Sequence, residues 1–323
     1  MKKIGLIDVD GKNFPNLALM KISAWHKSQK DIVSWYSPID GWFDKVYLSK
    51  VFSFSPDYDD CINADEIERG GSGYCITLEN GKEVFHQEQN KQLPAEIEHI
   101  YPDYSLYPEM TEDTAFGFLT RGCPRGCSFC IVEKKEGKCS RKVADLKEFW
   151  NGQSKIVLCD PNILACPEWR DLLIQLKESK AVVDFNQGLD IRLMTPEKIE
   201  LLNQIKTTEI HFAWDRYKDK SLVLPKFRMW SELSNKKQTH RVIVYTLVNF
   251  DSTLEEDLER IYTLRELGLW AYVMIYDKEH CSKVYKDLQR WCNNRFIFAS
   301  CPRFEYYKKT NTKKRESTLT LFQ

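Results

Sequence analysis

The amino-acid sequence predicts an α/β protein in which strands and helices alternate around a parallel sheet. Three observations support this fold class. Apolar segments of strand length alternate with amphipathic helical segments from about residue 113 onward; the first 54 residues read as strand, helix, strand and strand; and a polar, proline-bearing stretch separates the two regions. Alternating strands and helices are typical of parallel sheets covered by helices. We therefore predict a partial (β/α)6 barrel of the TIM type preceded by a small Rossmann-like domain.

Four regions follow from this organisation. We place the Rossmann-like domain at residues 1–95, a linker at 96–112, the partial barrel at 113–300 and a C-terminal tail at 301–323. The tail contains a cluster of basic residues between Lys308 and Arg315. We expect this tail to be a solvated, flexible end of the chain. A contact between this tail and nucleic acid or phosphate is the alternative.

The N-terminal region begins with a strand at residues 2–10, "KKIGLIDVD", followed by an amphipathic helix at 14–29 with Pro15 near its first turn. Further strands are expected at 31–37 and 44–54. This β-α-β opening predicts parallel strands. No G-x-G-x-x-G motif is present, so the dinucleotide-binding fingerprint is missing. In the segment 73–86, the pair Asn80-Gly81 between alternating apolar residues predicts a β-hairpin turn.

The barrel region contains six predicted strands, at residues 115–122, 155–160, 181–187, 209–215, 241–250 and 269–277. Helices are expected between them at 143–151, 167–179, 195–205 and 253–268. The third of these begins with Thr195 and Pro196, and the fourth has a Thr253/Glu256 capping box. Because the carboxyl ends of parallel strands carry the chemistry in such folds, the loops that follow these strands are the candidate site.

Composition excludes several classes of protein. Lysine plus arginine and aspartate plus glutamate number 47 each, so the formal net charge is zero and gives no reason to expect a nucleic-acid or membrane partner. The longest apolar stretch, "VIVYTLV", has the length of a strand, and acidic residues interrupt the N-terminus before a signal peptide can form. Eleven cysteines, an odd number in a chain of 323 residues, argue against a disulfide framework. We expect a cytoplasmic protein with no membrane segment.

Three of the cysteines, Cys123, Cys127 and Cys130, share one loop after the first barrel strand. Three thiolates within eight residues favour the binding of zinc or an iron-sulfur cluster over the binding of hard cations. A closed structural zinc site needs four protein ligands, and Cys139 is the available fourth. With only three ligands, a [4Fe-4S] cluster keeps one iron open for another molecule. The remaining cysteines are expected to be ordinary small side chains, although Cys281, Cys292 and Cys301 leave a further metal role open.

The segment "GCPRGCSFC" resembles the cluster-binding loop of radical S-adenosylmethionine (SAM) enzymes. The three cysteines match the cluster ligands of that family, and Phe129 matches its aromatic position before the last cysteine. The resemblance covers roughly residues 115–277. It implies a [4Fe-4S] cluster whose open iron binds the amino and carboxylate groups of SAM. Reductive cleavage of SAM in this family gives methionine and a 5′-deoxyadenosyl radical that abstracts hydrogen from a substrate.

The resemblance also implies residues that contact SAM, at the ends of the later strands. The family usually has a Gly-Gly-Glu type motif after the second strand, where this chain has "CDPN", so Asp160 and Asn162 are the polar groups available for the SAM amino group. The resemblance implies ribose and carboxylate contacts after the third and fourth strands and an adenine contact after the fifth. The candidates for these contacts are Asn186, Gln187, Arg192, Asp215, Arg216 and Asn249.

The N-terminal segment resembles the cobalamin-binding-like domain that precedes many radical SAM barrels. The usual D-x-H-x-x-G loop is degenerate here, because Asp10, Lys12 and Pro15 stand at the Asp, His and Gly positions. No imidazole can therefore bind cobalt from this loop, and we do not expect bound cobalamin, although some members bind it without the histidine. The glycine-rich turn "GGSG" at 70–73 is a candidate contact for the nucleotide tail of cobalamin.

We therefore predict a radical SAM enzyme that abstracts hydrogen from an unknown small-molecule, peptide or RNA substrate. An external electron donor such as flavodoxin or ferredoxin is implied as a partner. A cobalamin-dependent radical SAM methyltransferase is one alternative. A noncatalytic zinc or iron-sulfur module is the alternative of another class. The residue that performs catalysis on the substrate is not identified by any motif.

Overall fold

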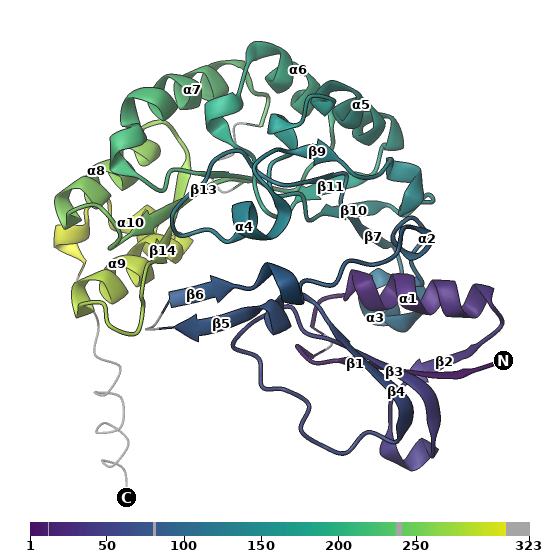
Figure 1. Cartoon of the computed structure of the whole chain (residues 1–323). Helices are drawn as coiled ribbons and strands as arrows, with labels where there is room; N and C mark the ends of the chain where they lie inside the picture. The colour runs from purple at the N-terminus through teal and green to yellow at the C-terminus, as the bar shows by residue number, and fades with distance from the viewer. Residues whose placement is uncertain (12, 80–81, 237–240, 308–323) are drawn as a thin grey trace, which may run out of the picture. The chain divides into compact units, whose positions relative to one another are not determined.

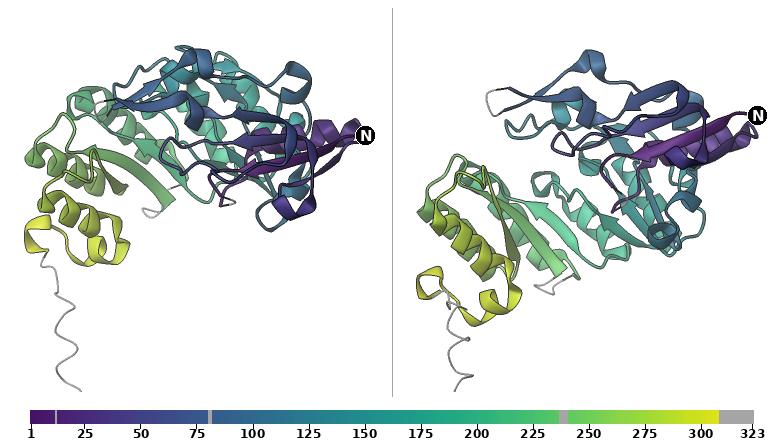
Figure 2. Two further views of the ribbon diagram at one scale, coloured as in Figure 1. Left: turned by 60° about the horizontal axis from the view of Figure 1, so that its bottom comes forward. Right: turned by 90° about the horizontal axis from the view of Figure 1, so that it is seen from below.

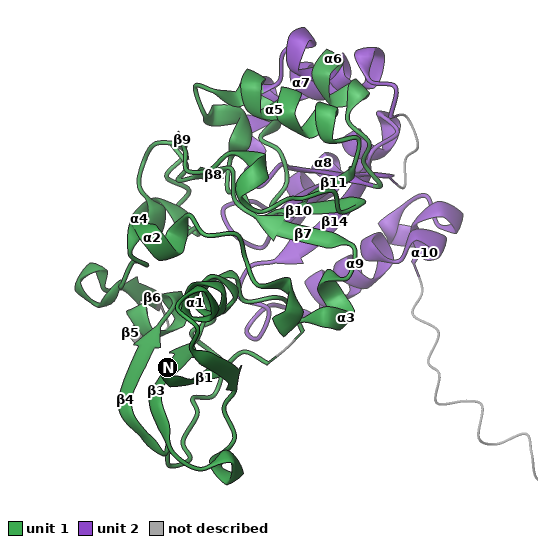
Figure 3. Ribbon diagram, turned by 90° about the vertical axis from the view of Figure 1, so that its right-hand side faces the viewer, with its two compact units in different colours: residues 1–193, 200–208 green, residues 194–199, 209–323 purple. Residues whose placement is uncertain are grey.

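The computed structural model describes residues 1–11, 13–79, 82–236 and 241–307 (Figure 1). The chain divides into two compact units (Figure 3). The first unit comprises Met1–Leu193 with Glu200–Thr208, and the second comprises Met194–Ile199 with Glu209–Gln323. The first unit therefore contains the N-terminal region together with the first half of the predicted barrel.

A four-stranded parallel sheet forms the N-terminal part of the first unit. Its strands have the order β2-β1-β3-β4. They are β1 (Lys3–Asp8), β2 (Ile32–Trp35), β3 (Phe43–Ser49) and β4 (Ala64–Gly70). The predicted β-α-β opening is confirmed. The strand β4 was not expected, because "ADEIERG" is mostly polar; it fits at the edge of the sheet, where several of its residues are exposed.

The helix α1 (Leu17–Ser28) begins at Asn16, whose side-chain oxygen accepts a hydrogen bond from the Leu19 amide at 3.2 Å. It packs beside the sheet, as Figures 1 and 2 show, and shares one core cluster with β1. The segment predicted as a linker contributes to the same cluster through the short helices α2 (Ala95–Glu98) and α3 (Pro108–Thr111) and the residues around them. The buried members from this segment are Ile97, Leu106 and Tyr107.

An antiparallel hairpin, β5 (Ile76–Glu79) and β6 (Lys82–Phe85), follows β4 as the alternating pattern predicts. Its predicted turn, Asn80-Gly81, lies outside the described residues. The same holds for residues 308–323, which include the basic cluster of the predicted tail. The last described segment contains a short 3-10 turn at Phe304–Tyr306.

The first half of the predicted barrel is a three-stranded parallel sheet of order β11-β10-β7. Its strands are β7 (Thr114–Gly117), β10 (Lys155–Leu158) and β11 (Val182–Phe185). Helix α5 (Trp169–Ser179) lies between the last two and buries Leu172, Leu173 and Leu176, as predicted. The segment 143–151, expected to be a helix, contains only the 3-10 turn Leu146–Glu148, because Phe149 leaves the turn to pack on Gly117.

The second unit contains the remaining predicted strands in a parallel sheet of order β12-β13-β14. They are β12 (Ile210–Ala213), β13 (Val242–Val248) and β14 (Trp270–Ile275). The helices of this half are α6 (Pro196–Gln204), which the two units share, and α7 (Lys220–Leu233), α8 (Leu254–Glu266), α9 (Lys283–Asn293) and α10 (Arg295–Ser300). The predicted capping box of Thr253 and Glu256 is present at the start of α8.

The observed architecture is thus an α/β fold with parallel sheets, as the sequence predicts. In the part of the chain that the structure describes, these sheets are open and do not close into a barrel. No helix among the described residues is long and apolar enough to span a bilayer.

Candidate functional site

The three cysteines lie in the loop that leaves the short strand β8 (Thr120–Arg121) and enters helix α4 (Val132–Glu136). The side chains of Cys123 and Cys127 are half-buried, and Cys130 is exposed. The Cys130 amide donates to the Cys127 carbonyl at 2.9 Å, so these two ligand candidates share one turn. The Cys123 amide donates to the Gly137 carbonyl at 3.2 Å. The loop is therefore closed onto the residues that follow α4.

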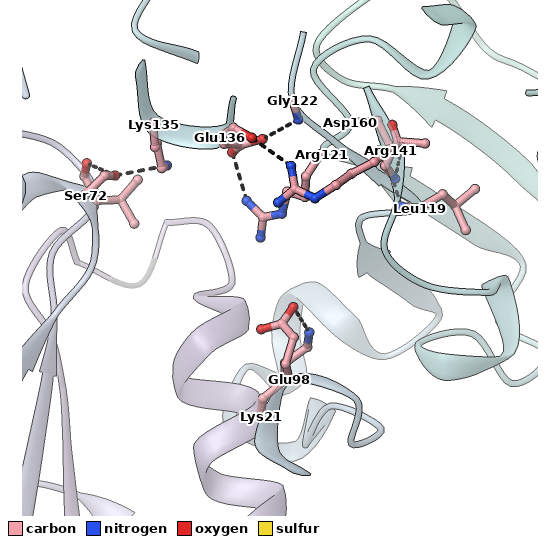
Figure 4. A network of polar contacts seen from close by, with 12 residues as sticks. Lys21, Ser72, Glu98, Leu119, Arg121, Gly122, Lys135, Glu136, Arg141 and Asp160 are labelled. Carbon is pink, nitrogen blue, oxygen red and sulfur yellow. Dashed lines mark hydrogen bonds and ion pairs between the residues drawn. The ribbon is translucent and has the colours of Figure 1, made fainter. Parts of the chain in front are cut away.

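Gly122 allows this closure. Its φ of +87° is a backbone conformation that side chains disfavour, and a Cβ here would lie 2.2 Å from the Cys139 carbonyl oxygen. Glu136 holds the same point: its carboxylate accepts from the Gly122 amide at 3.1 Å and from the Arg121 guanidinium at 2.9 Å (Figure 4). Its backbone carbonyl accepts from Arg141 on β9 (Arg141–Lys142) at 2.8 Å. Glu136 thus fixes the residue directly before Cys123.

Asp160, at the end of β10, anchors the strand that leads into the loop. Its carboxylate accepts from the Leu119 amide at 3.1 Å and from the amide and hydroxyl of Thr120 at 2.5 and 2.6 Å. The residue is only 4% exposed, and burial raises the pKa of Asp160 to about 6 against the opposing effect of these hydrogen bonds. Asp160 therefore has a clear structural task, and its predicted contact with SAM stays a prediction.

Asn162 connects the loop after β10 to the first cysteine. Its side-chain nitrogen donates to the Cys123 sulfur at 3.5 Å and to a carboxylate oxygen of Asp190 at 3.2 Å. Asn162 is 3% exposed, and its side-chain oxygen has no hydrogen-bond partner among the residues that the structure describes. A buried, unsatisfied carbonyl oxygen is costly in a folded protein. At this position it marks a place where a donor group of a ligand can bind.

Asp190, in the loop after β11, joins three parts of the site. Its carboxylate accepts from Arg125, inside the cysteine loop, at 2.5 Å and from the Arg192 side chain at 2.7 Å, in addition to Asn162. Burial opposes the charge of Asp190, but the two guanidinium groups outweigh it, and the pKa of Asp190 lies below its ordinary value. The carboxylate therefore stays ionised.

The structure brings part of the predicted SAM contacts together. Asn162 and Arg192 meet at Asp190, as described above. Phe129 is half-buried in the cysteine loop, Asn186 is half-buried after β11 and Gln187 beside it is exposed. Their assignment to SAM stays a prediction.

The other predicted contacts belong to the second unit. Arg216 donates to Asp251 at 3.1 Å and is preceded by Asp215, and Asn249, with φ of +62°, donates to the Tyr276 carbonyl at 3.0 Å. Each lies after a strand of the parallel sheet, as the sequence predicts. A role in binding SAM is not tested by these contacts.

Sequence reasoning missed four residues that organise the site: Arg125, Glu136, Asp190 and Lys135. Arg125 lies between two cysteines, but its sequence position does not reveal its partner 65 residues away. Asp190 had a weak signal in the Asp-x-Arg spacing with Arg192, which lets the carboxylate accept from both the backbone and the side chain of Arg192. Glu136 and Lys135 had none.

Several of the other cysteines are ordinary buried side chains, as predicted. Cys75, Cys159, Cys166 and Cys292 are buried, and burial raises the pKa of Cys159 to about 12 and that of Cys166 to about 11. Such thiols are unreactive near neutral pH. Cys139, the candidate fourth zinc ligand, is exposed, and Cys281 and Cys301 are half-buried.

The donor set in the loop fits an iron-sulfur cluster by its chemistry. Among the described residues, no three histidine, cysteine, aspartate or glutamate side chains are already arranged to hold a metal ion. The loop nevertheless offers three thiols, two of which share one hydrogen-bonded turn, together with a side-chain amide that donates to the Cys123 sulfur and the ion pair of Arg125 with Asp190. These are the ligand type and the surroundings that iron-sulfur clusters take.

The carboxyl edge of the N-terminal sheet forms a second region. The glycine turn after β4 packs against the segment after β3, and a Cβ at Gly71 would lie 2.3 Å from the Lys50 carbonyl oxygen. Asp10 accepts from the Val51 amide at 2.5 Å and from the Ser55 hydroxyl at 2.6 Å. The carboxylate of the degenerate loop therefore braces the chain itself. Several aromatic side chains are exposed in these segments, namely Phe14, Phe52 and Phe54.

Lys135 links this edge to the cysteine loop. It lies in α4, directly after the loop, and its ammonium group donates to the Ser72 hydroxyl in the glycine turn at 3.2 Å (Figure 4). Ser72 in turn donates to the Val51 carbonyl at 2.9 Å. Burial lowers the pKa of Lys135. The glycine turn and the cysteine loop are therefore neighbours within the first unit.

Solved structures of other proteins share the fold of this chain. The chain shares its fold with radical S-adenosylmethionine methyltransferases, which agrees with the predicted partial barrel and cobalamin-binding-like domain. The particular structures are of TsrM from Kitasatospora setae, one with cobalamin and a [4Fe-4S] cluster bound and one with tryptophan substrate and the SAM analogue aza-SAM bound. No family model matches the sequence, and no curated protein matches it.

The likeness to TsrM extends over most of both chains. The first structure matches with a TM-score of 0.59 and 10% identity, over 85% of this chain and 75% of TsrM. The second matches with the same score and identity, over 84% and 72%. At this identity the likeness shows the fold.

Proposed function

We propose that this protein is a radical SAM enzyme of the cobalamin-dependent methyltransferase type. The single observation that carries the proposal is the hydrogen bond between Lys135 and Ser72. It joins the helix after the cysteine loop to the glycine turn at the carboxyl edge of the N-terminal sheet. Ligands of parallel α/β sheets bind at this edge. A cofactor held there would lie beside the cysteine loop.

The proposed cluster ligands are Cys123, Cys127 and Cys130. When bound, the cluster supplies the low-potential electron that cleaves SAM, and cobalamin supplies a cobalt centre that carries a methyl group. An external donor such as flavodoxin or ferredoxin delivers the electron. The protein's own part is to hold the cysteine loop in place through Glu136, Asp160 and Asp190.

The unsatisfied side-chain oxygen of Asn162 supports the binding of SAM beside Cys123. An amide oxygen accepts hydrogen bonds from an ammonium group, which the amino group of SAM offers. Arg192 is held at Asp190 beside it and supplies positive charge near the proposed carboxylate position. Asn162 and Arg192 are thus the proposed SAM contacts with the strongest support among those predicted.

Cobalamin would be held without an imidazole ligand from the first loop. The residues at this edge offer a glycine turn and exposed aromatic side chains, which suit contact with a flat macrocycle. The expectation from sequence, that bound cobalamin is possible but not the favoured state, rests on the missing histidine. The shared fold with a structure that contains cobalamin favours binding over that expectation.

A second candidate is a radical SAM enzyme that abstracts hydrogen without cobalamin. The hydrogen bonds of Asp10, which stands at the aspartate position of the D-x-H-x-x-G motif, favour this candidate. Its carboxylate already accepts from two backbone amides and one hydroxyl within residues 51–55 and is therefore occupied by the protein itself. The substrate, whether a small molecule, peptide or RNA, and the cytoplasmic location remain predictions from the sequence.

Anaerobic purification with cofactor analysis tests the proposal. We expect about four iron and four sulfide per chain, and cobalamin retained in a 1:1 ratio after reconstitution. Turnover with a reductant and SAM should give S-adenosylhomocysteine as a product. An iron-loaded protein that retains no cobalamin and releases only 5′-deoxyadenosine would favour the hydrogen-abstracting candidate. One zinc per chain with no iron would overturn both.

Two cysteine variants identify the ligands. Cys127→Ala should lose nearly all cluster iron, since one of three thiolate ligands is removed. Cys139→Ala is the matched control, because this thiol is exposed and follows the same helix. It should retain wild-type iron and visible absorption. Equal iron loss in both variants would instead indicate a four-cysteine site.

A further inference from the structure

Asn162 is placed to do more than bind a ligand through its oxygen. Its side-chain nitrogen carries two hydrogens, and both have acceptors: the Cys123 sulfur at 3.5 Å and the Asp190 carboxylate at 3.2 Å. Rotating the amide by half a turn would put its oxygen against that carboxylate, acceptor against acceptor. Asp190 therefore fixes which end of the amide faces Cys123.

Asp190 is itself held by the cysteine loop. Arg125, between Cys123 and Cys127, donates to the same carboxylate oxygen that Asn162 uses, at 2.5 Å. The Asp190 side chain is 5% exposed, so its charge is poorly hydrated and depends on these partners. A series of polar contacts therefore begins at Arg125 in the cysteine loop, passes through Asp190 and Asn162, and ends at Cys123, the first cysteine of the same loop.

We propose that Asn162 is a positioning residue that donates an N–H···S hydrogen bond to the Cys123 thiolate, and that Asp190 orients it for this task. The inference rests on the proposed function, because it takes Cys123 as a cluster ligand. A hydrogen bond to a ligand sulfur stabilises the more negative, reduced cluster. Asn162 therefore raises the reduction potential of the cluster, and Asp190 acts through it.

The test measures the midpoint potential of the cluster by anaerobic redox titration, followed by electron paramagnetic resonance in the absence of SAM. Two variants remove the donor: Asn162→Leu, which keeps nearly the same shape, and Asn162→Ala. We expect both to retain iron and to shift the potential in the negative direction. Asn151→Ala is the matched control, since the same amide side chain is removed at an exposed position. It should leave the potential unchanged.

A double-mutant cycle tests the part of Asp190. Asp190→Asn alters the charge near the cluster as well as the amide orientation, so its effect is measured in the wild-type and in the Asn162→Leu background. We expect the two shifts to differ, because only the wild-type background has an amide to misorient. Equal shifts would show that Asp190 does not act through Asn162 and would overturn that part.

The outcomes separate this inference from the proposed function. A wild-type protein that takes up no iron overturns the proposed function, and the inference with it. A wild-type protein with a normal cluster whose potential is unchanged in both Asn162 variants overturns the inference alone. Loss of the cluster in both variants, with native circular dichroism, also overturns it, since Asn162 would then be needed to retain iron.

Discussion

Two buried carboxylates flank the cysteine loop, and the protein surrounds them in opposite ways. Asp160, after β10, accepts from uncharged donors on Leu119 and Thr120. Asp190, after β11, accepts from the guanidinium groups of Arg125 and Arg192. Burial therefore wins at Asp160, whose pKa rises to about 6, whereas the positive charges win at Asp190, whose pKa is lowered.

The difference separates two tasks. Asp160 fixes backbone, because its partners are the residues that lead from β7 into β8 just before the cysteines. Asp190 fixes charged and polar side chains, one of which lies in the loop and one of which contacts Cys123. Substitutions at these two positions should therefore lower the free energy of unfolding by different amounts and with different dependence on pH.

The largest effect is expected at Asp190 near neutral pH. Asp190→Asn removes the buried negative charge that accepts from the guanidinium groups of Arg125 and Arg192, which should lower the free energy of unfolding by about 3 kcal/mol. Chemical unfolding of the apoprotein at pH 7.5 measures it. Asp171→Asn, an exposed position in the first turn of α5, is the matched control. A loss at Asp190 no greater than that of the control would contradict the role of this carboxylate.

A smaller effect of opposite pH dependence is expected at Asp160. Since its folded pKa of about 6 lies above the ordinary value of 3.8, the folded protein binds more protons than the unfolded chain between these values. The contribution of Asp160 to stability therefore falls as the pH rises through this window. At Asp190 the contribution is present above the ordinary pKa and is lost only as the pH falls below it.

Asp160→Asn tests this sign. Its amide nitrogen cannot accept a hydrogen bond from Leu119 or Thr120, and we expect a loss of about 1 to 2 kcal/mol at pH 4.5. At pH 7.5 the loss should be smaller, because the wild-type protein then carries a buried charge. Unfolding curves at both pH values decide the matter. A loss that grows with pH would show that the carboxylate is stabilised in its charged form.

The smallest effect is expected at Glu136. Glu136→Gln replaces one of two accepting oxygens, so either the Gly122 amide or the Arg121 guanidinium loses its partner, at a cost of about 1 kcal/mol. Glu178→Gln, exposed on α5, serves as the control and should be neutral. Faster oxygen-driven bleaching of the cluster in Glu136→Gln is the second readout. Equal bleaching rates in the two variants would contradict a role of Glu136 in holding the cysteine loop.

The sequence predicted much of the fold because local signals were strong. The Thr253/Glu256 capping box and the apolar strands reappear in the structure. The strand β4 was missed because its polar residues lack a strand pattern, and α4 because its residues "VEKKE" follow the loop without a periodic apolar face.

The candidate site likewise contains features that the sequence predicts and features that it does not. The spacing of the three cysteines was readable, since all its members are neighbours in sequence. The partners of Asp160 and Asp190 were not, because they are separated by 40 and 65 residues along the chain and spacing carries no information at that distance. Asn162 was proposed from its place after a strand, but its bond to Cys123 required the folded chain.

The most direct test of the account is the electron paramagnetic resonance spectrum of the reduced wild-type protein with and without SAM. If the three cysteines hold a [4Fe-4S] cluster with an open iron, the reduced protein gives the signal of such a cluster, and SAM changes that signal by binding to the iron. A protein that binds zinc in place of iron, or a cluster signal that SAM leaves unchanged, would contradict the central claim.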